Sequence, residues 1–427
     1  MHKKTGFVII LVIAILCCLA AVFHAPIIET FTENLVHLVH HRYPAYFRQG
    51  HASEEPAGQN SAGDCTTVEP LPEAVPREFI LAATGDIMIH SPQITSAYRE
   101  NEGRYDFYEN FFYVEPYFKK ADFVVGNLET TLAGEEFGGY SGYPLFNSPP
   151  ELAAVLKKGG FDLLSTANNH TLDRGPSGVI NTINNIEKAG LDFVGTARCR
   201  EEREKVYLLS KNGIRTAFLA YSYGTNGLPV PPDKDYLINL IDEELISKDI
   251  FRAKNTHAAD IIVVCMHWGQ EYQRVPSERQ KELARILIDL GADIIIGNHP
   301  HVIQPAEIVE TEKSSGLVFY SLGNFISNQR ERYCDTGMIA FIKIQFEPET
   351  DTYSISLLEI EPTWVHKFKQ GERWKYRILP VREVLNTALP QEIFNLSPES
   401  FQRMQEALRE TMEIIYPCPP AEMMFCK

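Results

Sequence analysis

The feature that most constrains the fold is a series of short apolar runs, each of which ends in a polar residue. The six runs are EFILAATGD (78–86), ADFVVGN (121–127), FDLLSTANN (161–169), IIVVCMH (261–267), DIIIGNH (293–299) and LVFYSLGN (317–324). Runs of this length are typical of buried strands. Between two of them, Ser277 and Gln280 form a capping-box pattern at the start of a helical segment that Gly291 ends. Strands that alternate with helices predict an α/β layered domain.

Two further segments predict antiparallel pairing. Asn212 and Gly213 stand between the apolar runs of 206–222, which is the strongest short signal of a β-hairpin. Residues 338–346 and 353–360 alternate in polarity on either side of an acidic turn. The sheets of this domain are therefore predicted to be mixed.

The N-terminus has the pattern of a membrane segment. Lys3 and Lys4 precede an uncharged apolar run at 6–22, and acidic residues follow it. That run is near the lower limit of roughly 17 residues for a bilayer-spanning helix. We predict a membrane anchor over residues 1–25, with the rest of the chain outside the cell. A cleaved signal peptide is the alternative.

The rest of the chain divides into three parts by composition. Residues 26–77 are predicted to form a juxtamembrane helix and a flexible linker rich in Gly, Ser, Pro and acidic residues. Residues 78–380 are predicted to form the folded domain. Residues 381–427 are predicted to form a helical tail, whose segment 398–416 has apolar residues on one face.

The composition of the chain limits the classes of partner that it is expected to bind. The chain has 427 residues and a net charge of −16. Nucleic acid is an unfavourable partner for such a chain, because binding to a phosphate backbone depends on clustered Lys and Arg. Eight cysteines show no paired spacing. Cys418 and Cys426 can form a disulfide in an oxidising exterior, or both can remain thiols.

Polar side chains with metal-binding chemistry gather at the predicted strand ends. They are Asp86, His90, Asn127, Glu129, Asn169, His170, His267, His299 and His301. In open α/β sheets the carboxyl ends of strands converge on one crevice, so we expect these residues to meet in space. A single histidine after a strand is more often structural, but so many at strand ends indicate a common site. Imidazole, carboxylate and amide oxygens suit one or two divalent ions of the Mn, Fe, Co, Ni or Zn class.

The linked motifs resemble a known family. GDIMIH, NLETTL, ANNHTLDRG, MHWGQEY, GNHPHV and YSLGNF lie within residues 79–330. Together they are similar to the calcineurin-like metallophosphoesterase superfamily, and more closely to the family of the capsule and poly-γ-glutamate biosynthesis protein CapA. The resemblance implies a layered α/β/β/α metallophosphoesterase-like sandwich with mixed sheets, here preceded by the N-terminal membrane helix.

The resemblance also implies roles for the site residues. It makes Asp86, Asn169, His267, His299 and His301 metal ligands, and His170 the catalytic histidine beside them. Two positions depart from the superfamily pattern. Met88 replaces a histidine of the first motif, and Asn127 stands where an aspartate usually bridges two ions. Glu129 or His90 can compensate, so the number of ions, one or two, stays open.

The implied chemistry is hydrolysis of a phosphoester or acyl bond. His170 would protonate the leaving group, and Asp173 would orient its imidazole or else only shape the start of a helix. Arg174 would hold an anionic group of the substrate, or else be a solvated turn residue.

We expect a membrane-anchored, metal-dependent hydrolase that, by resemblance, acts in the synthesis, export or attachment of an anionic capsule polymer. Its substrate would be an anionic polymer or a phosphoester, and capsule-synthase subunits are candidate partners. A noncatalytic assembly subunit is one alternative. A cell-wall or lipid phosphodiesterase is another.

Overall fold

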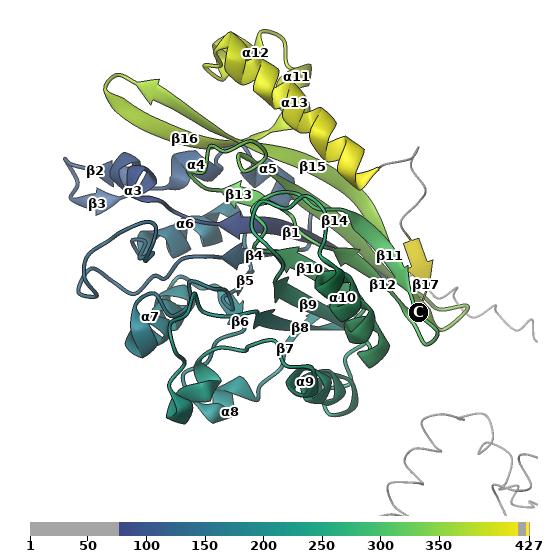
Figure 1. Ribbon diagram of the computed structural model, residues 1–427. Coiled ribbons are helices and arrows are strands. Elements are labelled where there is room, and N and C mark those ends of the chain that lie inside the picture. The colour runs from purple at the N-terminus through teal and green to yellow at the C-terminus, as the bar shows by residue number, and fades with distance from the viewer. Residues whose placement is uncertain (1–76, 417–423, 427) are drawn as a thin grey trace, which may run out of the picture. The chain divides into compact units, whose positions relative to one another are not determined.

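A computed structural model describes residues 77–416 and 424–426 (Figure 1). The predictions for the membrane anchor and for Cys418 fall outside these residues, as does nearly all of the predicted linker. Within the described part of the chain, no helix has the length and hydropathy needed to cross a bilayer.

The first sheet contains strands from both the N-terminal and the C-terminal parts of the described chain. Among the described residues it has nine strands, in the order β16-β15-β14-β1-β4-β5-β6, with β13 also paired to β1 and β17 to β15. Strands β1, β4, β5 and β6 are parallel neighbours, while β14 to β16 are antiparallel. The strands are β1 (Arg77–Ile87), β4 (Phe123–Leu128), β5 (Leu163–Ser165), β6 (Asp192–Val194), β13 (Asn324–Ile326), β14 (Thr336–Glu347), β15 (Thr352–Gln370), β16 (Arg373–Pro380) and β17 (Met424–Cys426).

The second sheet contains six strands in the order β11-β12-β10-β9-β8-β7 within the described residues. They are β7 (Tyr207–Lys211), β8 (Ile214–Ser222), β9 (Ile261–His267), β10 (Ile294–Asn298), β11 (Ala306–Glu310) and β12 (Ser315–Phe319). The two edge pairs are antiparallel and the others parallel. Strands β7 and β8 form the predicted hairpin, and both Asn212 (φ 50°) and Gly213 (φ 75°) have the positive φ that its two-residue turn requires. The prediction of mixed α/β sheets is confirmed. A separate pair, β2 (Tyr98–Arg99) and β3 (Arg104–Tyr105), forms a small two-stranded sheet.

The two sheets pack face to face through an apolar core. Leu81 and Val125 of the first sheet and Val263 and Ile294 of the second are all buried in this shared cluster. Helices cover both outer faces, each with its own apolar cluster. The layers are therefore helix, sheet, sheet and helix. On the first sheet lie α3 (Ser91–Ala97), α4 (Tyr108–Phe111), α5 (Glu115–Phe118), α6 (Glu151–Gly159) and α7 (Gly175–Lys188); on the second lie α9 (Glu243–Asn255) and α10 (Glu278–Leu290).

Local signals explain where α10 begins and ends. The Ser277 hydroxyl accepts a hydrogen bond from the backbone amide of Gln280, whose side chain accepts one from the backbone amide of Ser277. Gly291 follows the helix in the left-handed conformation at φ 111°. Both features were predicted from the sequence. The short α8 (Arg200–Arg203) lies in the connection from β6 to β7 between the two sheets, and the 3-10 helix η2 (Pro232–Leu237) lies between β8 and α9.

The C-terminal helices pack on strands β15 and β16. They are α11 (Val381–Asn386), α12 (Pro390–Ile393) and α13 (Pro398–Ile415). Trp364 and Leu379 from the strands share an apolar cluster with Met404 of α13. Asp335 adds a polar connection, because it accepts hydrogen bonds from Trp364 Nε1 at 2.8 Å and from Arg403 Nη2 at 2.8 Å.

Glu361 of β15 is buried beneath helix α11. Its Oε1 accepts a hydrogen bond from the backbone amide of Arg382 at 2.9 Å, and its residue is 1% exposed. Burial raises the pKa of Glu361 from 4.5 to about 7. The unfolded chain therefore loses this proton at a lower pH than the folded chain does. The stability that this group contributes is full below pH 4.5 and is lost as pH rises to 7.

We expect Glu361→Gln to be more stable than the wild type at pH 8, by about 2 kcal/mol. Glutamine keeps the acceptor for the Arg382 amide and cannot ionise. At pH 4.5 the two proteins should unfold at nearly the same urea concentration. The exposed Glu310→Gln serves as the control and should change neither curve. A stabilisation of equal size at both pH values would contradict this account.

Candidate metal centre

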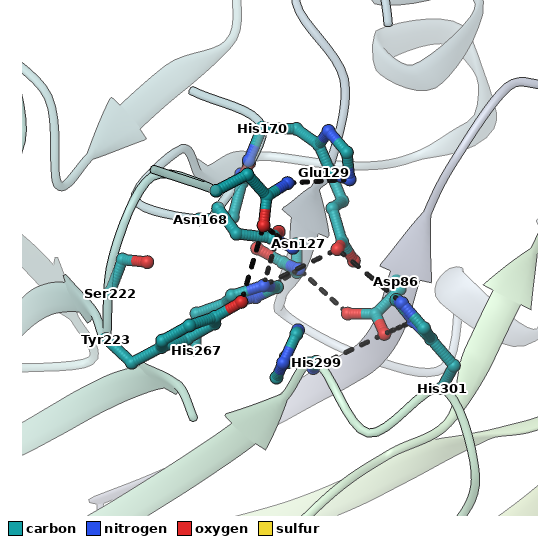
Figure 2. Close-up of polar contacts among 12 residues, drawn as sticks. Asp86, Asn127, Glu129, Asn168, His170, Ser222, Tyr223, His267, His299 and His301 are labelled. Atoms are coloured by element: carbon teal, nitrogen blue, oxygen red, sulfur yellow. Dashed lines mark hydrogen bonds and ion pairs between the residues drawn. The ribbon is translucent and has the colours of Figure 1, made fainter. Parts of the chain in front are cut away.

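The candidate ligands lie where parallel strands of both sheets end. Asp86 of β1 is paired in register with Asn127 of β4, and Asn298 of β10 is paired with His267 of β9. Because neighbouring parallel strands point the same way, their polar end residues share one edge of each sheet. The two edges face a common space, into which the side chains project (Figure 2).

Close backbone contacts fix the position of Asp86. After β12 the chain leaves the second sheet, turns at Gly323 and enters β13 of the first. The Asp86 amide donates to the Gly323 carbonyl at 2.9 Å. A Cβ atom on Gly85 would lie 1.8 Å from that carbonyl oxygen, and Gly323 itself has φ +70°. Only glycine fits at both positions, which explains the GD and LGN sequences at these strand ends.

Asp86 is the most heavily bonded carboxylate of the site. Its Oδ1 accepts from Asn127 Nδ2 at 2.8 Å, and its Oδ2 lies 2.9 Å from His301 Nδ1. The backbone amide of His299 also points to Oδ2, at 3.4 Å. Residues that are more than 200 positions apart in sequence are thus held together by one buried side chain.

Glu129, which follows β4, is buried without a hydrogen-bond donor for either carboxylate oxygen among the described residues. Its Oε1 lies 3.4 Å from His267 Nε2 and 3.8 Å from His301 Nε2. Burial, and next the neighbouring Asp86 carboxylate, raise the pKa of Glu129 well above 4.5. Glu129 and Asp86 can share a hydrogen bond only if one of them is protonated. A cation between them would remove this conflict.

Two histidines of the site, His267 and His299, are held in their neutral form. Burial and the neighbouring imidazoles lower the pKa of His267, and they lower the pKa of His299 to about 2. Neutral imidazole is the form that binds a metal ion. His299 (φ 99°) and His301 (φ 59°) both have left-handed backbone conformations, which are strained for residues with a Cβ atom. Such strain is typical of functional sites.

These residues fit one or two divalent ions. Two groups have ligand atoms that all lie within 4.8 Å of one another: Glu129, His299 and His301, and Asp86, Glu129 and His267. Glu129 belongs to both. Buried polar atoms without partners among the described residues include both oxygens of Glu129, Asn127 Oδ1 and His299 Nδ1. A mixed oxygen and nitrogen donor set of this kind suits a first-row divalent ion.

The two predicted amide ligands, Asn127 and Asn169, lie at the same edge of the first sheet but make different contacts. Asn169 Oδ1 lies 2.9 Å from His267 Nε2. Asn127 directs its amide group at Asp86 and lies 3.3 Å from His267 Nδ1. An aspartate at this position would add a third buried carboxylate next to two others. Asn127 avoids that repulsion but offers only one oxygen, and Glu129 takes the shared position between the two groups.

His170 and Asp173 form a hydrogen-bonded pair beside these ligands. His170 Nδ1 lies 2.7 Å from Asp173 Oδ2, which also accepts from the Phe146 amide at 2.6 Å. The Phe146 ring packs against the imidazole edge to face, with centroids 4.6 Å apart. The ring orientation of His170 is therefore fixed, and Nε2 is directed toward Asn226 Nδ2 at 3.5 Å.

The structure places His90 outside both ligand groups. It is the N-cap of α3, is partly buried, and its Nδ1 accepts from the Asn328 amide at 3.2 Å. Burial lowers the pKa of His90 to about 4. His90, His170 and His301 line one cavity of about 730 Å³. His90 thus belongs to the cavity wall, whereas Glu129 belongs to both ligand groups.

Two residues of the site were not predicted from the sequence. Tyr223 follows β8, and its ring lies over His299 with centroids 4.5 Å apart and stacks on His267 at 6.2 Å. Asn226 accepts from Asn169 Nδ2 at 3.2 Å and has a positive φ of 50°. Strand β8 was identified through its hairpin, and its polar end, SYGTNG, was not compared with the other strand ends. The Asn226-Gly227 turn signal was available.

Replacing His299 and His301 together with alanine should remove bound metal while leaving the fold intact, because both lie on a loop after β10. The full-length chain would be purified and its Mn, Fe, Co, Ni and Zn content measured by mass spectrometry, with circular dichroism as the test of folding. His257→Ala, away from the site, is the matched control. Full metal content in the double variant would show that these histidines are not ligands.

Comparisons with known proteins agree with the sequence motifs. The family model described as bacterial capsule synthesis protein PGA_cap matches residues 80–329. The chain is 32% identical over 269 residues to the capsule biosynthesis protein CapA of Bacillus anthracis, covering 61% of this chain and 63% of the relative. It is 36% identical over 231 residues to the PGA biosynthesis protein CapA of Bacillus subtilis (strain 168), covering 51% and 57%. The chain thus spans less than two thirds of the length of these curated relatives.

The solved structures are less similar to this chain than the two CapA relatives are. The NAD nucleotidase NadN of Haemophilus influenzae has a TM-score of 0.44 and 14% identity, covering 80% of this chain and 57% of that chain. The calcineurin-like phosphoesterase YfkN of Bacillus subtilis has a TM-score of 0.37 and 14% identity, covering 79% and 99%. TM-scores this low do not establish a common fold. The family match, in contrast, covers more than half of the chain and includes every candidate ligand. This chain therefore belongs to the bacterial capsule synthesis protein PGA_cap family.

Proposed function

We propose that this protein is a metal-dependent hydrolase that acts in the synthesis, export or attachment of an anionic capsule polymer such as poly-γ-glutamate. The observation that carries the proposal is Glu129, a buried carboxylate without a hydrogen-bond donor among the described residues, next to the imidazoles of three histidines. Burying such a charge is costly unless a cation pairs with it. The capsule assignment rests on the family and on the similarity to the two CapA relatives.

The residues of both ligand groups would hold the ion or ions. A divalent ion bound there would polarise the bond to be cleaved and lower the pKa of a water molecule. The protein supplies the rest. Tyr223 covers His267 and His299 on one side and limits the access of solvent to them. Asp86 holds the His301 ring through Nδ1 and leaves Nε2 directed toward Glu129.

His170 is the proton donor in this proposal. The Asp173 carboxylate stabilises the protonated imidazole through Nδ1, so that Nε2 carries the proton to be given away. Nε2 faces the cavity, which His170 lines. When the scissile bond breaks, this proton passes to the departing oxygen or nitrogen, and the imidazole is left neutral.

The second candidate function is a noncatalytic assembly subunit that keeps the scaffold and binds polymer or synthase subunits. The observation that favours it is Asn127. Its amide directs a hydrogen at Asp86 Oδ1, the oxygen that a second ion would need. A site with one weakly held ion would bind an anion but would lose much of its catalytic power.

His170→Ala should separate the two functions, because loss of the proton donor costs typically 10²- to 10⁴-fold in turnover but leaves the ligand groups in place. The variant would be introduced into the chromosomal copy, and cell-surface protein, metal content and polymer yield would be measured. We expect unchanged protein and metal with strongly reduced polymer. His257→Ala is the control. Polymer at the wild-type level in His170→Ala would contradict catalysis and favour the assembly subunit.

We also propose that the domain lies outside the cell and is held by the N-terminal apolar segment. The support is the charge asymmetry around residues 6–22. Protease added to intact cells should remove the domain. Digestion that occurs only after the cells are lysed would contradict this topology.

A further inference from the structure

The cavity next to the candidate metal centre has a second chemical feature in its lining. Residues Asn328 to Glu331, which follow β13, line it together with His90, His170 and His301. The volume of about 730 Å³ is large enough for more than a phosphate or a single carboxylate. The cavity therefore has room for parts of a substrate beyond the reacting group.

Arg330 presents an unpaired cation to this cavity. Its Nε donates to the Gln329 carbonyl at 2.8 Å and its Nη1 to the Val365 carbonyl at 3.0 Å. Both acceptors are neutral. No carboxylate of residues 77–416 lies within ion-pair distance of its guanidinium, although the side chain is exposed to the cavity. The two carbonyls fix the guanidinium plane and leave Nη2 available for a ligand.

Lys367 adds a second positive charge behind Arg330. Its Nζ donates to Asn328 Oδ1 at 3.0 Å and lies 4.7 Å from the centre of the Trp374 ring. The same strand segment contacts Arg330, whose Nη1 donates to the Val365 carbonyl. Burial, and next the charge of Arg330, lower the pKa of Lys367. The described part of the chain offers Lys367 no ion pair either.

Other basic residues near the site are differently engaged. Arg174 was a predicted anion-binding residue, but its guanidinium donates to Ser141 Oγ and, at 3.1 Å, to the Leu145 carbonyl, and so holds the loop before Phe146. Arg377 is paired with Glu109 at 2.6 Å. Arg330 is thus the basic side chain among the cavity-lining residues that is free to bind an anion.

We propose that Arg330 binds an anionic group that flanks the scissile bond of the substrate. Lys367, which donates to the side chain of Asn328, adds to the positive potential near Arg330. This inference rests on the proposed function and specifies its substrate class: a chain with a carboxylate or phosphate beside each linkage. The ligand groups and His170 act on the bond itself, while Arg330 fixes the neighbouring anion by a charge-assisted hydrogen bond. Glu271 and Glu331 also line the cavity, so the positive potential is local and suits one anionic group.

The test measures binding to the full-length chain by titration calorimetry. The probes are a γ-linked glutamate pentamer and the same pentamer with its side carboxylates amidated. We expect the wild type to prefer the carboxylate form, and Arg330→Gln to lose about tenfold in affinity for that form alone. Glu331→Gln should strengthen binding of the carboxylate form. Arg332→Gln, two residues away and paired with Glu410, is the matched control and should bind as the wild type does.

A glycerol phosphodiester is the third probe. Binding of the phosphodiester that depends on Arg330, with equal affinity for the two pentamers, would support the anion site and assign it to a phosphate. Affinities for all three probes that are the same in the wild type and in Arg330→Gln, or equal losses in Arg330→Gln and Arg332→Gln, would overturn the inference. If binding depends on Arg330 but the protein has no hydrolase activity, the anion site is supported and only the proposed catalysis is rejected.

Discussion

The hydrogen bond from the Asp86 amide to the Gly323 carbonyl joins the end of β1 to the segment that crosses from the second sheet to the first. Around this crossing segment, neighbouring backbone segments lie so close together that some positions have no room for a side chain. A Cβ atom on Gly297 would lie 2.1 Å from the Tyr320 carbonyl oxygen, and one on Gly337 would lie 2.3 Å from that of Asn324. These glycines let the backbone segments around the crossing pack closely. The crossing holds the ends of the two sheets, which carry the ligands, next to one another.

Electrostatics then explains the composition of the site. Two buried carboxylates, Asp86 and Glu129, face imidazoles that burial keeps neutral. An ionised, buried carboxylate needs a positive partner, but a buried imidazole resists the protonation that would make it positive. Without a cation, the two kinds of group therefore cannot both be stable in the same site. The amide at Asn127 limits the negative charge to two groups. The site thus has the charge that one or two divalent ions would balance.

The cavity beside the ligands has walls of different chemistry. Tyr143, Leu145 and Tyr272 line it and are 75%, 42% and 49% exposed, which is unusual for large apolar side chains. Arg330, His90 and His170 also line it. Under the proposed function, these side chains would contact the apolar and the anionic parts of one substrate.

Much of the fold could be read from the sequence, because the signals are local. Apolar runs identified β1, β4, β9 and β10, and the capping pattern at Ser277 located α10. The runs ended in polar residues because each strand emerges from the core at the same edge, so candidate ligands were identified with the strands. The length of β15, which continues through Pro362 to Gln370, was missed, since its outer half has no simple alternation.

The sequence by itself determined the elements and the residue types at their ends. Only the tertiary structure decided which of these residues meet, because separations across two sheets depend on strand order and register and not on local preference. It placed Glu129 in both ligand groups and His90 on the cavity wall. It also brought Asn226 to His170 and Arg330 into the cavity, since the loops that carry them are positioned by the strands before them.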